Sequence, residues 1–302
     1  MEEYHGEAHR NMMIRTVDMK KLAKYYLLII FFGIWSTTMA SDKTNNSPSM
    51  LFNLNGKTVI VTGASQGIGK QFANVLNKAG ARVILASRNI EKLNEFSKNL
   101  HNTKAIQMDI ANSASVKEAF FQLEKAGEKI DICINNAATV ARTPIFSENS
   151  NDDFESLIQT NVMGVWYVTK AAAIHMKNNG IHGSIINIGS INGDSFPYKE
   201  LTAYAVSKAA VIHMTKSLVN ELSEYKIRIN TINPGPIQSD LLGSQTKHDP
   251  EFWKDKIPAG FIAKPSDLDG LILYLASNDA SRYVTGATFT IDGGISWRGK
   301  SW

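Results

Sequence analysis

The sequence predicts an α/β fold, in which a single doubly wound parallel sheet carries helices on both faces and follows an apolar N-terminal leader. From Lys57 onward, short runs of β-branched and apolar residues alternate with amphipathic stretches. Continuous apolar runs are typical of parallel strands buried on both faces, and their alternation with helical stretches is typical of a doubly wound sheet. A glycine-rich turn directly after the first apolar run supplies the strand-to-helix junction that such a fold needs.

Each expected strand is a short apolar run, and each expected helix repeats apolar residues at helical spacing. The expected strands are residues 58–61, 82–86, 105–108, 130–134, 184–188, 227–232 and 288–291. The expected helices are residues 68–80 and stretches near 89–100, 113–125, 153–178 and 204–223. Right-handed connections between parallel strands then bring the carboxyl ends of the strands to one edge, where a ligand is expected to bind.

The composition suits one large domain with an N-terminal extension. The chain has 302 residues, of which 43% are hydrophobic and 20% are charged, as in ordinary soluble globular proteins. Its net charge of +4 is small for this length, so the charge balance does not favour nucleic acid as a partner. Cys133 is the only cysteine, which excludes an intramolecular disulfide and a multi-cysteine zinc site. Its apolar neighbours predict a buried inert thiol, and no metal site is expected.

Residues 1–50 are expected to be a leader and linker, and residues 51–302 the folded domain. The apolar run Tyr25–Trp35 has 11 residues, fewer than the about 20 that span a bilayer as a helix. Lysines precede it and Thr38-Met39-Ala40 follows, as in a secretory signal peptide. Three alternatives remain: a signal peptide, an uncleaved membrane anchor, and a mis-extended reading frame that truly starts at Met50. Membrane contact is expected only through an uncleaved leader, and a start near Met50 would leave the protein cytoplasmic.

The glycine-rich segment reads Thr62-Gly63-Ala64-Ser65-Gln66-Gly67-Ile68-Gly69 and opens the first expected helix. Gly63 permits a tight turn, Gly67 lets the backbone approach a phosphate closely, and Gly69 lets the helix pack on the sheet. The N-terminus of the helix favours an anion. The segment therefore predicts a site for the pyrophosphate of a dinucleotide, with Ser65, Gln66 and Ile68 among the contact residues.

Ser87 and Arg88 end the second expected strand, where the adenosine ribose of a bound dinucleotide should lie. An acidic side chain there would bind the ribose 2′-hydroxyl, whereas an arginine accommodates a 2′-phosphate. Because no acid occupies this position, the sequence favours NADP(H), and NAD(H) remains an alternative. The competing interpretation of Arg88 is a solvated arginine at a helix start.

Tyr204 and Lys208 form a Tyr-x-x-x-Lys pair, and Ser190 lies before them at the end of an expected strand. Residues four apart share one face of a helix, so Lys208 can approach Tyr204. A nearby cation stabilises tyrosinate, and we expect it to lower the tyrosine pKa from about 10 toward the operating range. Tyr204 could then protonate a developing alkoxide, or deprotonate an alcohol, while Ser190 binds the substrate oxygen.

With these motifs, and with Asp109, Asn135-Asn136-Ala137, Asn161 and Pro234-Gly235, the chain resembles the short-chain dehydrogenase/reductase family over roughly Leu54 to Gly294. The resemblance implies a Rossmann-type fold. It also implies that Asn161 is a fourth catalytic residue beside Ser190, Tyr204 and Lys208, holding a water that relays protons to the lysine. It implies that Asp109 contacts the adenine, that Asn135 lies along the cofactor, and that Ile237 and Ser239 lie beside the nicotinamide. The further cofactor contacts expected are Ile110, Ala137, Tyr204, Lys208, Pro234 and Gly235.

Three departures from the family pattern stand out. Ala138 occupies the position of the glycine that usually closes the Asn-Asn-Ala-Gly motif, and we expect slight crowding of that turn. Ser190 and Tyr204 lie 14 positions apart, about one more than the family pattern, so the loop between them is expected to bulge. Gln66 lacks the basic side chain that many NADP-preferring relatives carry there, which weakens the preference for NADP(H).

These motifs predict an oxidoreductase that transfers a hydride between a nicotinamide cofactor and a ketone or secondary alcohol. Within the family, the chain most resembles 3-oxoacyl-ACP reductases and gluconate 5-dehydrogenase-like enzymes. The alternative is a dinucleotide-binding regulator without turnover. The loop between Pro236 and Pro265 is expected to set substrate specificity, and Phe196-Pro197-Tyr198 can form the opposite wall of the pocket. A homotetramer or homodimer is expected from the resemblance alone.

Overall fold

Seven parallel strands form one sheet in the computed structural model, which describes residues 47–148, 150–238, 253 and 255–297. The spatial order is β3-β2-β1-β4-β5-β6-β7, so the direction of winding reverses between β1 and β4. A reversal of this kind opens a crevice at the carboxyl ends of the two strands. The strands are β1 (Thr58–Thr62), β2 (Arg82–Ser87), β3 (Thr103–Gln107), β4 (Ile132–Asn135), β5 (Ser184–Ile188), β6 (Arg228–Pro234) and β7 (Thr288–Ile291).

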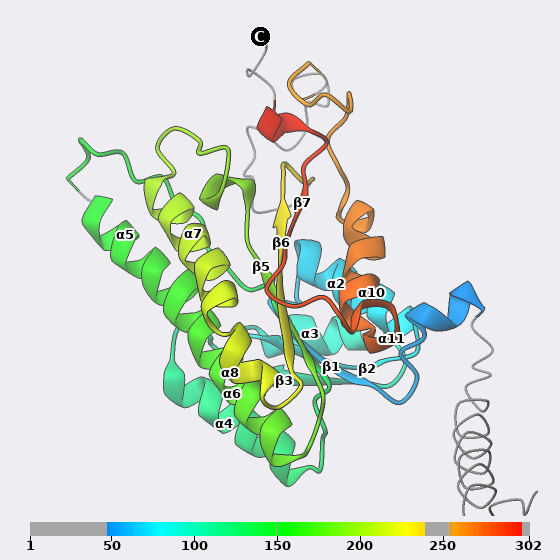
Figure 1. Ribbon diagram of the computed structural model, residues 1–302. Coiled ribbons are helices and arrows are strands. Elements are labelled where there is room, and N and C mark those ends of the chain that lie inside the picture. The colour runs from blue at the N-terminus through cyan, green and yellow to red at the C-terminus, as the bar shows by residue number, and fades with distance from the viewer. Residues whose placement is uncertain (1–46, 149, 239–252, 254, 298–302) are drawn as a thin grey trace, which may run out of the picture. The chain divides into compact units, whose positions relative to one another are not determined.

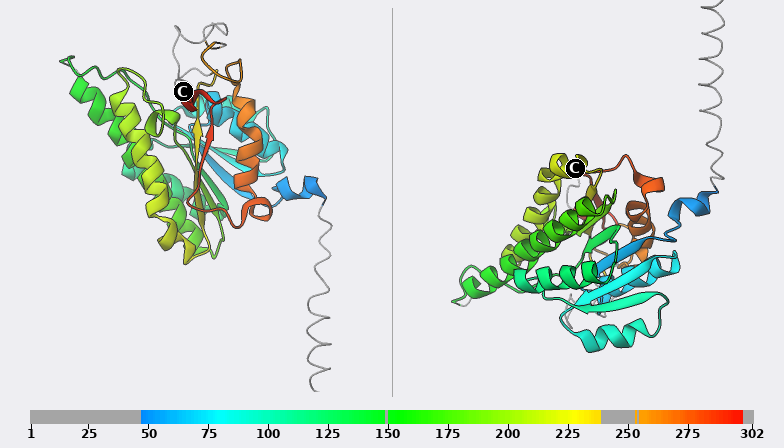
Figure 2. Two further views of the ribbon diagram at one scale, coloured as in Figure 1. Left: turned by 45° about the horizontal axis from the view of Figure 1, so that its top comes forward. Right: turned by 90° about the horizontal axis from the view of Figure 1, so that it is seen from below.

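Helices cover both faces of the sheet (Figures 1 and 2). The first face carries α2 (Gly67–Lys78), α3 (Ile90–Ser97) and α10 (Asp269–Ala276), followed by the short α11 (Asn278–Ser281). The second face carries α4 (Ser113–Lys125), α6 (Gly164–Asn178) and α8 (Val219–Ser223), with α5 (Ser150–Ile158) and α7 (Thr202–Ser217) beside α6. Shorter helical turns are η1 (Pro48–Phe52), η2 (Gln159–Met163), η3 (Ile191–Gly193), η5 (Pro265–Leu268) and η6 (Ile295–Trp297), of which η2 is a π-helix.

Alternate residues of each central strand enter opposite cores, which explains the continuous apolar runs. Val59 and Val61 of β1 pack against Phe72 of α2 on one face, whereas Ile60 packs on the other. Cys133 lies in the second core, fully buried, and burial raises the pKa of its thiol to about 12. The predicted burial of this thiol is therefore confirmed, and its lack of reactivity stays a prediction.

The predicted doubly wound parallel sheet is confirmed for the described residues. All seven expected strands are present, with their ends shifted by at most two residues. Two long helical predictions were wrong as single helices. The stretch near 153–178 is divided by the π-helix η2, and the stretch near 204–223 is divided at Leu218 into α7 and α8.

The leader lies outside the described residues, apart from its last few positions, as does most of the expected specificity loop. None of the helices in residues 47–148, 150–238, 253 and 255–297 is long and apolar enough to cross a bilayer. The expected division into residues 1–50 and 51–302 stays a prediction.

Candidate active site

The turn after β1 has the backbone geometry that the glycines were expected to provide. Gly63 and Gly67 adopt φ angles of +68° and +56°, in the left-handed region that favours glycine. Gln66 is the N-cap residue of α2, and its side chain accepts no hydrogen bond from the first turn of the helix. The N–H groups at this end therefore remain available to an anion.

Gly69 serves packing and lines neither of the two cavities described below. A methyl group at this position would overlap the carbonyl of Gly63 and the side chain of Asn136. Asn136 holds the same turn from the other side, because its Nδ2 donates to Thr62 O over 3.0 Å and its backbone N donates to Thr62 Oγ1 over 3.0 Å. No separate role was predicted for Asn136, which connects β1 with the end of β4.

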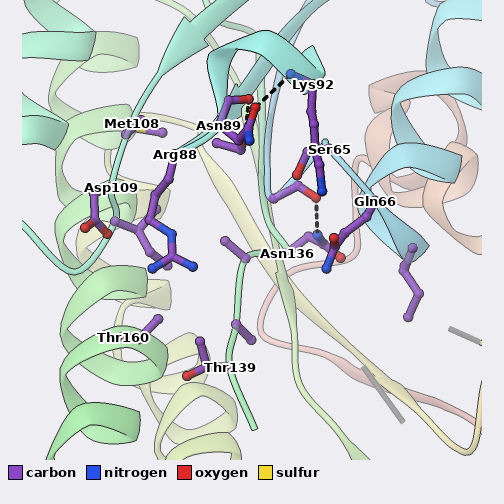
Figure 3. Close-up of a pocket in the computed structure, with 17 residues that line it drawn as sticks. Ser65, Gln66, Arg88, Asn89, Lys92, Met108, Asp109, Asn136, Thr139 and Thr160 are labelled. Atoms are coloured by element: carbon purple, nitrogen blue, oxygen red, sulfur yellow. Dashed lines mark hydrogen bonds between the residues drawn. The ribbon is translucent and has the colours of Figure 1, made fainter. Parts of the chain in front are cut away.

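A cavity of about 330 Å³ opens at the carboxyl ends of β1, β2 and β4, beside this turn. Figure 3 shows Arg88 and Asp109 on one side of it, with Ser65 and Gln66 on the other. The cavity is lined by these predicted cofactor-binding residues: Gly63, Ser65, Gln66, Gly67, Ile68, Ser87, Arg88, Asp109, Ile110 and Ala137. Sequence reasoning missed Asn89, Lys92, Met108, Thr139 and Thr160, which also line it.

The residues of this cavity fit a dinucleotide. An open helix N-terminus and a glycine turn lie at one end, where backbone N–H groups can bind a pyrophosphate. Arg88 and Lys92 add two cations, and Lys92 is held at the start of α3, where its backbone N donates to Asn89 Oδ1 over 2.8 Å. Lys92 could have been found from the sequence, because it is a second cation shortly after the end of β2, in the first turn of the following helix.

A second cavity of about 670 Å³ adjoins the first, since Ile68, Asn136 and Ala138 line both. Its walls are mainly apolar. Seven predicted site residues lie on it: Ile68, Ser190, Tyr204, Lys208, Pro234, Gly235 and Ile237. Of the expected substrate walls, Tyr198 and Trp253 line it, whereas Phe196 and Pro197 do not. Ser239 lies outside the described residues.

Ser190, Tyr204 and Lys208 come together on this second cavity from two elements. Ser190 caps η3 directly after β5, and its Oγ accepts from Asn192 N over 3.2 Å. Tyr204 and Lys208 are both buried in the first turns of α7. Lys208 Nζ lies 5.6 Å from the centre of the Tyr204 ring and donates to Ile188 O over 2.7 Å. The expected approach of Lys208 to Tyr204 is present.

The expected lowering of the Tyr204 pKa was wrong in direction. Burial raises the pKa of Tyr204 to about 12, and the hydrogen bond with Ser190 opposes this only in part. Burial also lowers the pKa of Lys208 to about 8, since desolvation disfavours the charged form of either side chain. Desolvation therefore outweighs the hydrogen bond with Ser190, and the buried phenol stays protonated near neutral pH.

Asn161 lies in the π-helix η2, which interrupts the helical run between α5 and α6, and such turns occur frequently at functional sites. Its side chain is fully buried and lines neither cavity. The amide accepts from Thr139 N over 2.9 Å, and donates to Thr139 O over 2.9 Å and to Ser207 Oγ over 3.1 Å. Ser207 in turn donates to Tyr204 O over 2.8 Å. Asn161 therefore fixes the loop after β4 relative to α7.

Asn135 is also buried, and its side chain points into the fold. Its Nδ2 donates to Thr169 Oγ1 and to Asn187 Oδ1, both over 2.8 Å, and Asn135 lines neither cavity. Ala138 does not adopt a positive φ, so the turn that closes this motif does not require a glycine. The expected slight crowding at Ala138 stays a prediction.

The loop between Ser190 and Tyr204 contributes Tyr198, Lys199, Glu200 and Leu201 to the lining of the second cavity, and the expected bulge stays a prediction. Glu200 in this loop has a φ of +63°, which is unusual for a residue with a side chain. Its carbonyl accepts from Thr143 N over 2.7 Å, and its carboxylate pairs with Arg142 over 2.7 Å. The loop after β4 and the loop before α7 are thus joined across the mouth.

The chain matches known proteins over most of its length. A family model described as enoyl-(acyl carrier protein) reductase matches residues 63–296. Oxidoreductase UcpA of Salmonella typhimurium is 38% identical over 252 residues, which cover 80% of this chain and 95% of that relative. The chain belongs to the short-chain dehydrogenase/reductase family.

Two other members of the short-chain dehydrogenase/reductase family show how widely its substrates vary. The 3-oxoacyl-[acyl-carrier-protein] reductase FabG of Rickettsia conorii is 36% identical over 245 residues, covering 81% of this chain and 99% of that relative. The structure of a gluconate 5-dehydrogenase from Burkholderia cenocepacia, in complex with NADP and tartrate, has a TM-score of 0.75 and 30% identity. That match covers 83% of this chain and 99% of the other. As a member of this family, the protein is an NAD(P)-dependent oxidoreductase of alcohol and ketone substrates.

Proposed function

We propose that the protein is an NADP(H)-preferring reductase of ketones, or dehydrogenase of secondary alcohols, with Tyr204 as its general acid and base. The observation that carries the proposal is the convergence of Ser190, Tyr204 and Lys208 on one cavity that adjoins the glycine turn. A buried phenol beside a buried ammonium group has no evident structural benefit, because both groups are costly to desolvate. Perturbed titratable groups of this kind are typical of catalytic sites.

The residues divide the chemistry between them. When bound, the nicotinamide supplies a hydride to a carbonyl carbon or accepts one from an alcohol. Ser190 Oγ hydrogen-bonds the substrate oxygen, and Tyr204 Oη donates its proton to that oxygen in the reductive direction. The ammonium of Lys208 then stabilises the resulting tyrosinate. Since burial lowers the pKa of Lys208 to about 8, this lysine can exchange a proton near neutral pH.

In this proposal, Asn161 holds the loop after β4 in place relative to α7. Its amide is engaged by Thr139 and Ser207, so the water relay that the family resemblance implies would need a further group of the site. We expect Asn161 substitutions to weaken the alignment of Tyr204 and to leave the pKa of Lys208 unchanged.

The preference for NADP(H) rests on two cations at the carboxyl end of β2. Arg88 and Lys92 both line the first cavity, and the residue that ends β2 is Ser87, which carries no charge. An arginine at this position accommodates a 2′-phosphate, whereas an acid would select the 2′-hydroxyl. The Burkholderia cenocepacia relative with bound NADP supports the same cofactor. NAD(H) is the alternative.

A homotetramer or homodimer also remains our proposal. Helices α6 and α7 each expose an aliphatic side chain to solvent: Ile174 is 48% exposed and Val206 is 45% exposed. Light scattering on the purified protein measures the assembly directly, and a monomer at micromolar concentration would contradict it.

The function is tested by following NADPH oxidation with a panel of ketones, using the wild-type protein and Tyr204→Phe. We expect turnover with the wild type only, since Tyr204→Phe removes the proton donor and leaves the ring in place. Fluorescence titration should give NADPH affinities within a few-fold for both proteins. Binding of NADPH by the wild type without turnover on any ketone or secondary alcohol would favour the alternative, a dinucleotide-binding regulator.

A further inference from the structure

We propose that Arg142 recognises a carboxylate on the substrate, and that Glu200 competes with this carboxylate for the same guanidinium. The preferred substrates would then be oxo acids or hydroxy acids whose carboxylate reaches the mouth of the second cavity. This inference rests on the proposed function and specifies its substrate class.

Arg142 is part of the cavity that contains the reacting groups. It lines the same 670 Å³ space as Ser190 and Tyr204. Its Nη1 pairs with Glu200 Oε2 over 2.7 Å, and no other acceptor contacts its guanidinium among the described residues. A guanidinium has five N–H donors in a planar fork, so most of them remain available to a planar carboxylate.

The position of Arg142 is fixed relative to Tyr204 by the residues next to it. Thr143 N donates to Glu200 O over 2.7 Å, and Ala203 N donates to Thr143 Oγ1 over 3.1 Å. Ala203 directly precedes Tyr204 in the first turn of α7. The residue after Arg142 is thus hydrogen-bonded to the residue before the proposed proton donor, so a substrate held by Arg142 would be positioned relative to Tyr204.

The charges on the cavity wall favour an anion. Among the residues that the structure describes, its charged lining residues are Arg142, Lys199, Glu200 and Lys208, three cations against one carboxylate. Lys208 lies deep in the site beside Tyr204, whereas the side chain of Arg142 is 73% exposed and that of Glu200 is 30% exposed. Because the remaining lining residues are uncharged, a carboxylate that enters the cavity would meet Arg142 and Lys199 at its mouth.

If the Arg142–Glu200 ion pair only holds the two loops together, the two variants should affect substrates alike. If Arg142 binds the substrate, the two variants should have opposite effects on acids. Arg142→Gln and Glu200→Gln break the same ion pair, so a mere latch between the two loops would weaken all substrates alike in both variants. If Arg142 binds the substrate, Arg142→Gln should weaken binding of acids, whereas Glu200→Gln removes the competing carboxylate and should strengthen it.

The test compares short oxo acids of increasing chain length with their methyl esters, under NADPH, for the wild type, Arg142→Gln and Glu200→Gln. Arg282→Gln is the matched control, because Arg282 is exposed and lines neither cavity. We expect the wild type to prefer at least one acid to its ester by about tenfold or more in kcat/KM. Arg142→Gln should abolish that preference through KM, with kcat for the ester retained, and Glu200→Gln should increase it. The acid preference should also decline with added salt.

Turnover of the esters without preference for any acid would refute the inference and leave the proposed function intact. Equal losses on acids and esters in Arg142→Gln and Glu200→Gln would also refute it, in favour of a structural latch. If the wild type reduced none of the acids and none of the esters but did reduce another ketone, the inference would be refuted and the proposed function would stand. Failure on every ketone and every secondary alcohol would refute both. Melting temperatures of the variants, which we expect to differ by only a few degrees, show whether each variant is folded.

Discussion

Lys208 Nζ lies 5.6 Å from the centre of the Tyr204 ring and donates a hydrogen bond to Ile188 O at the end of β5. The lysine is thereby held by the sheet, independently of the ring it faces. Burial shifts the two pKa values in opposite directions, to about 12 for Tyr204 and about 8 for Lys208. Near neutral pH the pair therefore consists of a neutral phenol and a cation, which suits proton donation to a reduced carbonyl.

The first prediction concerns the pH dependence of the two reaction directions. Ketone reduction requires protonated Tyr204 and cationic Lys208, so kcat/KM for reduction should fall as pH rises through about 8, where Lys208 loses its proton. Alcohol oxidation requires a deprotonated tyrosine, so its rate should increase from neutral to alkaline pH. Steady-state kinetics between pH 6 and 10 in both directions measure this, with the folded state checked by circular dichroism. A reductive rate that rises steadily with pH would contradict the assignment.

The second prediction concerns the stability cost of Lys208. Its pKa in the folded protein is about 8, below the ordinary value of 10.5, so the unfolded chain binds more protons between these two values. Stability due to this group is therefore lowest below pH 8 and increases with pH up to about 10.5. Lys208→Met removes this cost but also removes the hydrogen bond to Ile188 O. The net effect should be a free energy of unfolding that is higher by about 1 to 2 kcal/mol at pH 7.

Urea denaturation at pH 7 and pH 10 distinguishes this effect from better packing. The advantage of Lys208→Met should shrink at the higher pH, because Lys208 of the wild type is then uncharged. Lys216→Met is the matched control, since Lys216 is exposed on the same helix. An advantage independent of pH would show that desolvation of the charge is not the cause.

The third prediction concerns cofactor choice. Arg88→Ala should weaken NADPH binding by roughly ten- to hundredfold, while NADH binding changes by only a few-fold, because only NADPH presents a 2′-phosphate. Lys92→Ala should produce a smaller loss in the same direction. Fluorescence titration with both cofactors measures these affinities. Equal losses for NADPH and NADH would place Arg88 elsewhere on the dinucleotide and overturn the preference.

The fourth prediction concerns the packing of α2 on β1. Gly69→Ala would force a methyl group into Asn136 and the Gly63 carbonyl, and should destabilise the protein by roughly 1 to 3 kcal/mol. Gly270→Ala makes the same chemical change in α10, where nothing lies within 4 Å of the added carbon. It should be neutral, or stabilising by up to about 1 kcal/mol. Thermal denaturation of both variants compares them, and similar melting temperatures would contradict the argument.

The sequence predicted the sheet well because its strands are buried on both faces, so burial and local pattern agree. The break in the expected 153–178 helix could not be foreseen, since the residues of η2 do not differ in hydrophobic spacing from an α-helix. Asn161 in η2 contacts Thr139 and Ser207, which are distant in the sequence, and a local pattern does not reveal such contacts.

The site was predicted where a motif fixes the backbone, and less well where tertiary contacts decide. The turn around Gly63 and Gly67 and the Tyr204–Lys208 pair lie as expected. Asn135 and Asn136 were harder to assign, because adjacent strand residues point to opposite faces and only one of them can line the cavity. The direction of the Tyr204 pKa depends on how deeply α7 is buried, which spacing along the chain does not reveal.

The solitary thiol of Cys133 has a practical consequence. A thiol that is fully buried and titrates near pH 12 does not react with maleimides or methanethiosulfonates under mild conditions. A cysteine introduced at the surface would then be the only reactive thiol, and Cys133 would not have to be replaced before labelling. A spin label or dye at exposed Lys199 would report from the mouth of the second cavity alone, against a silent background.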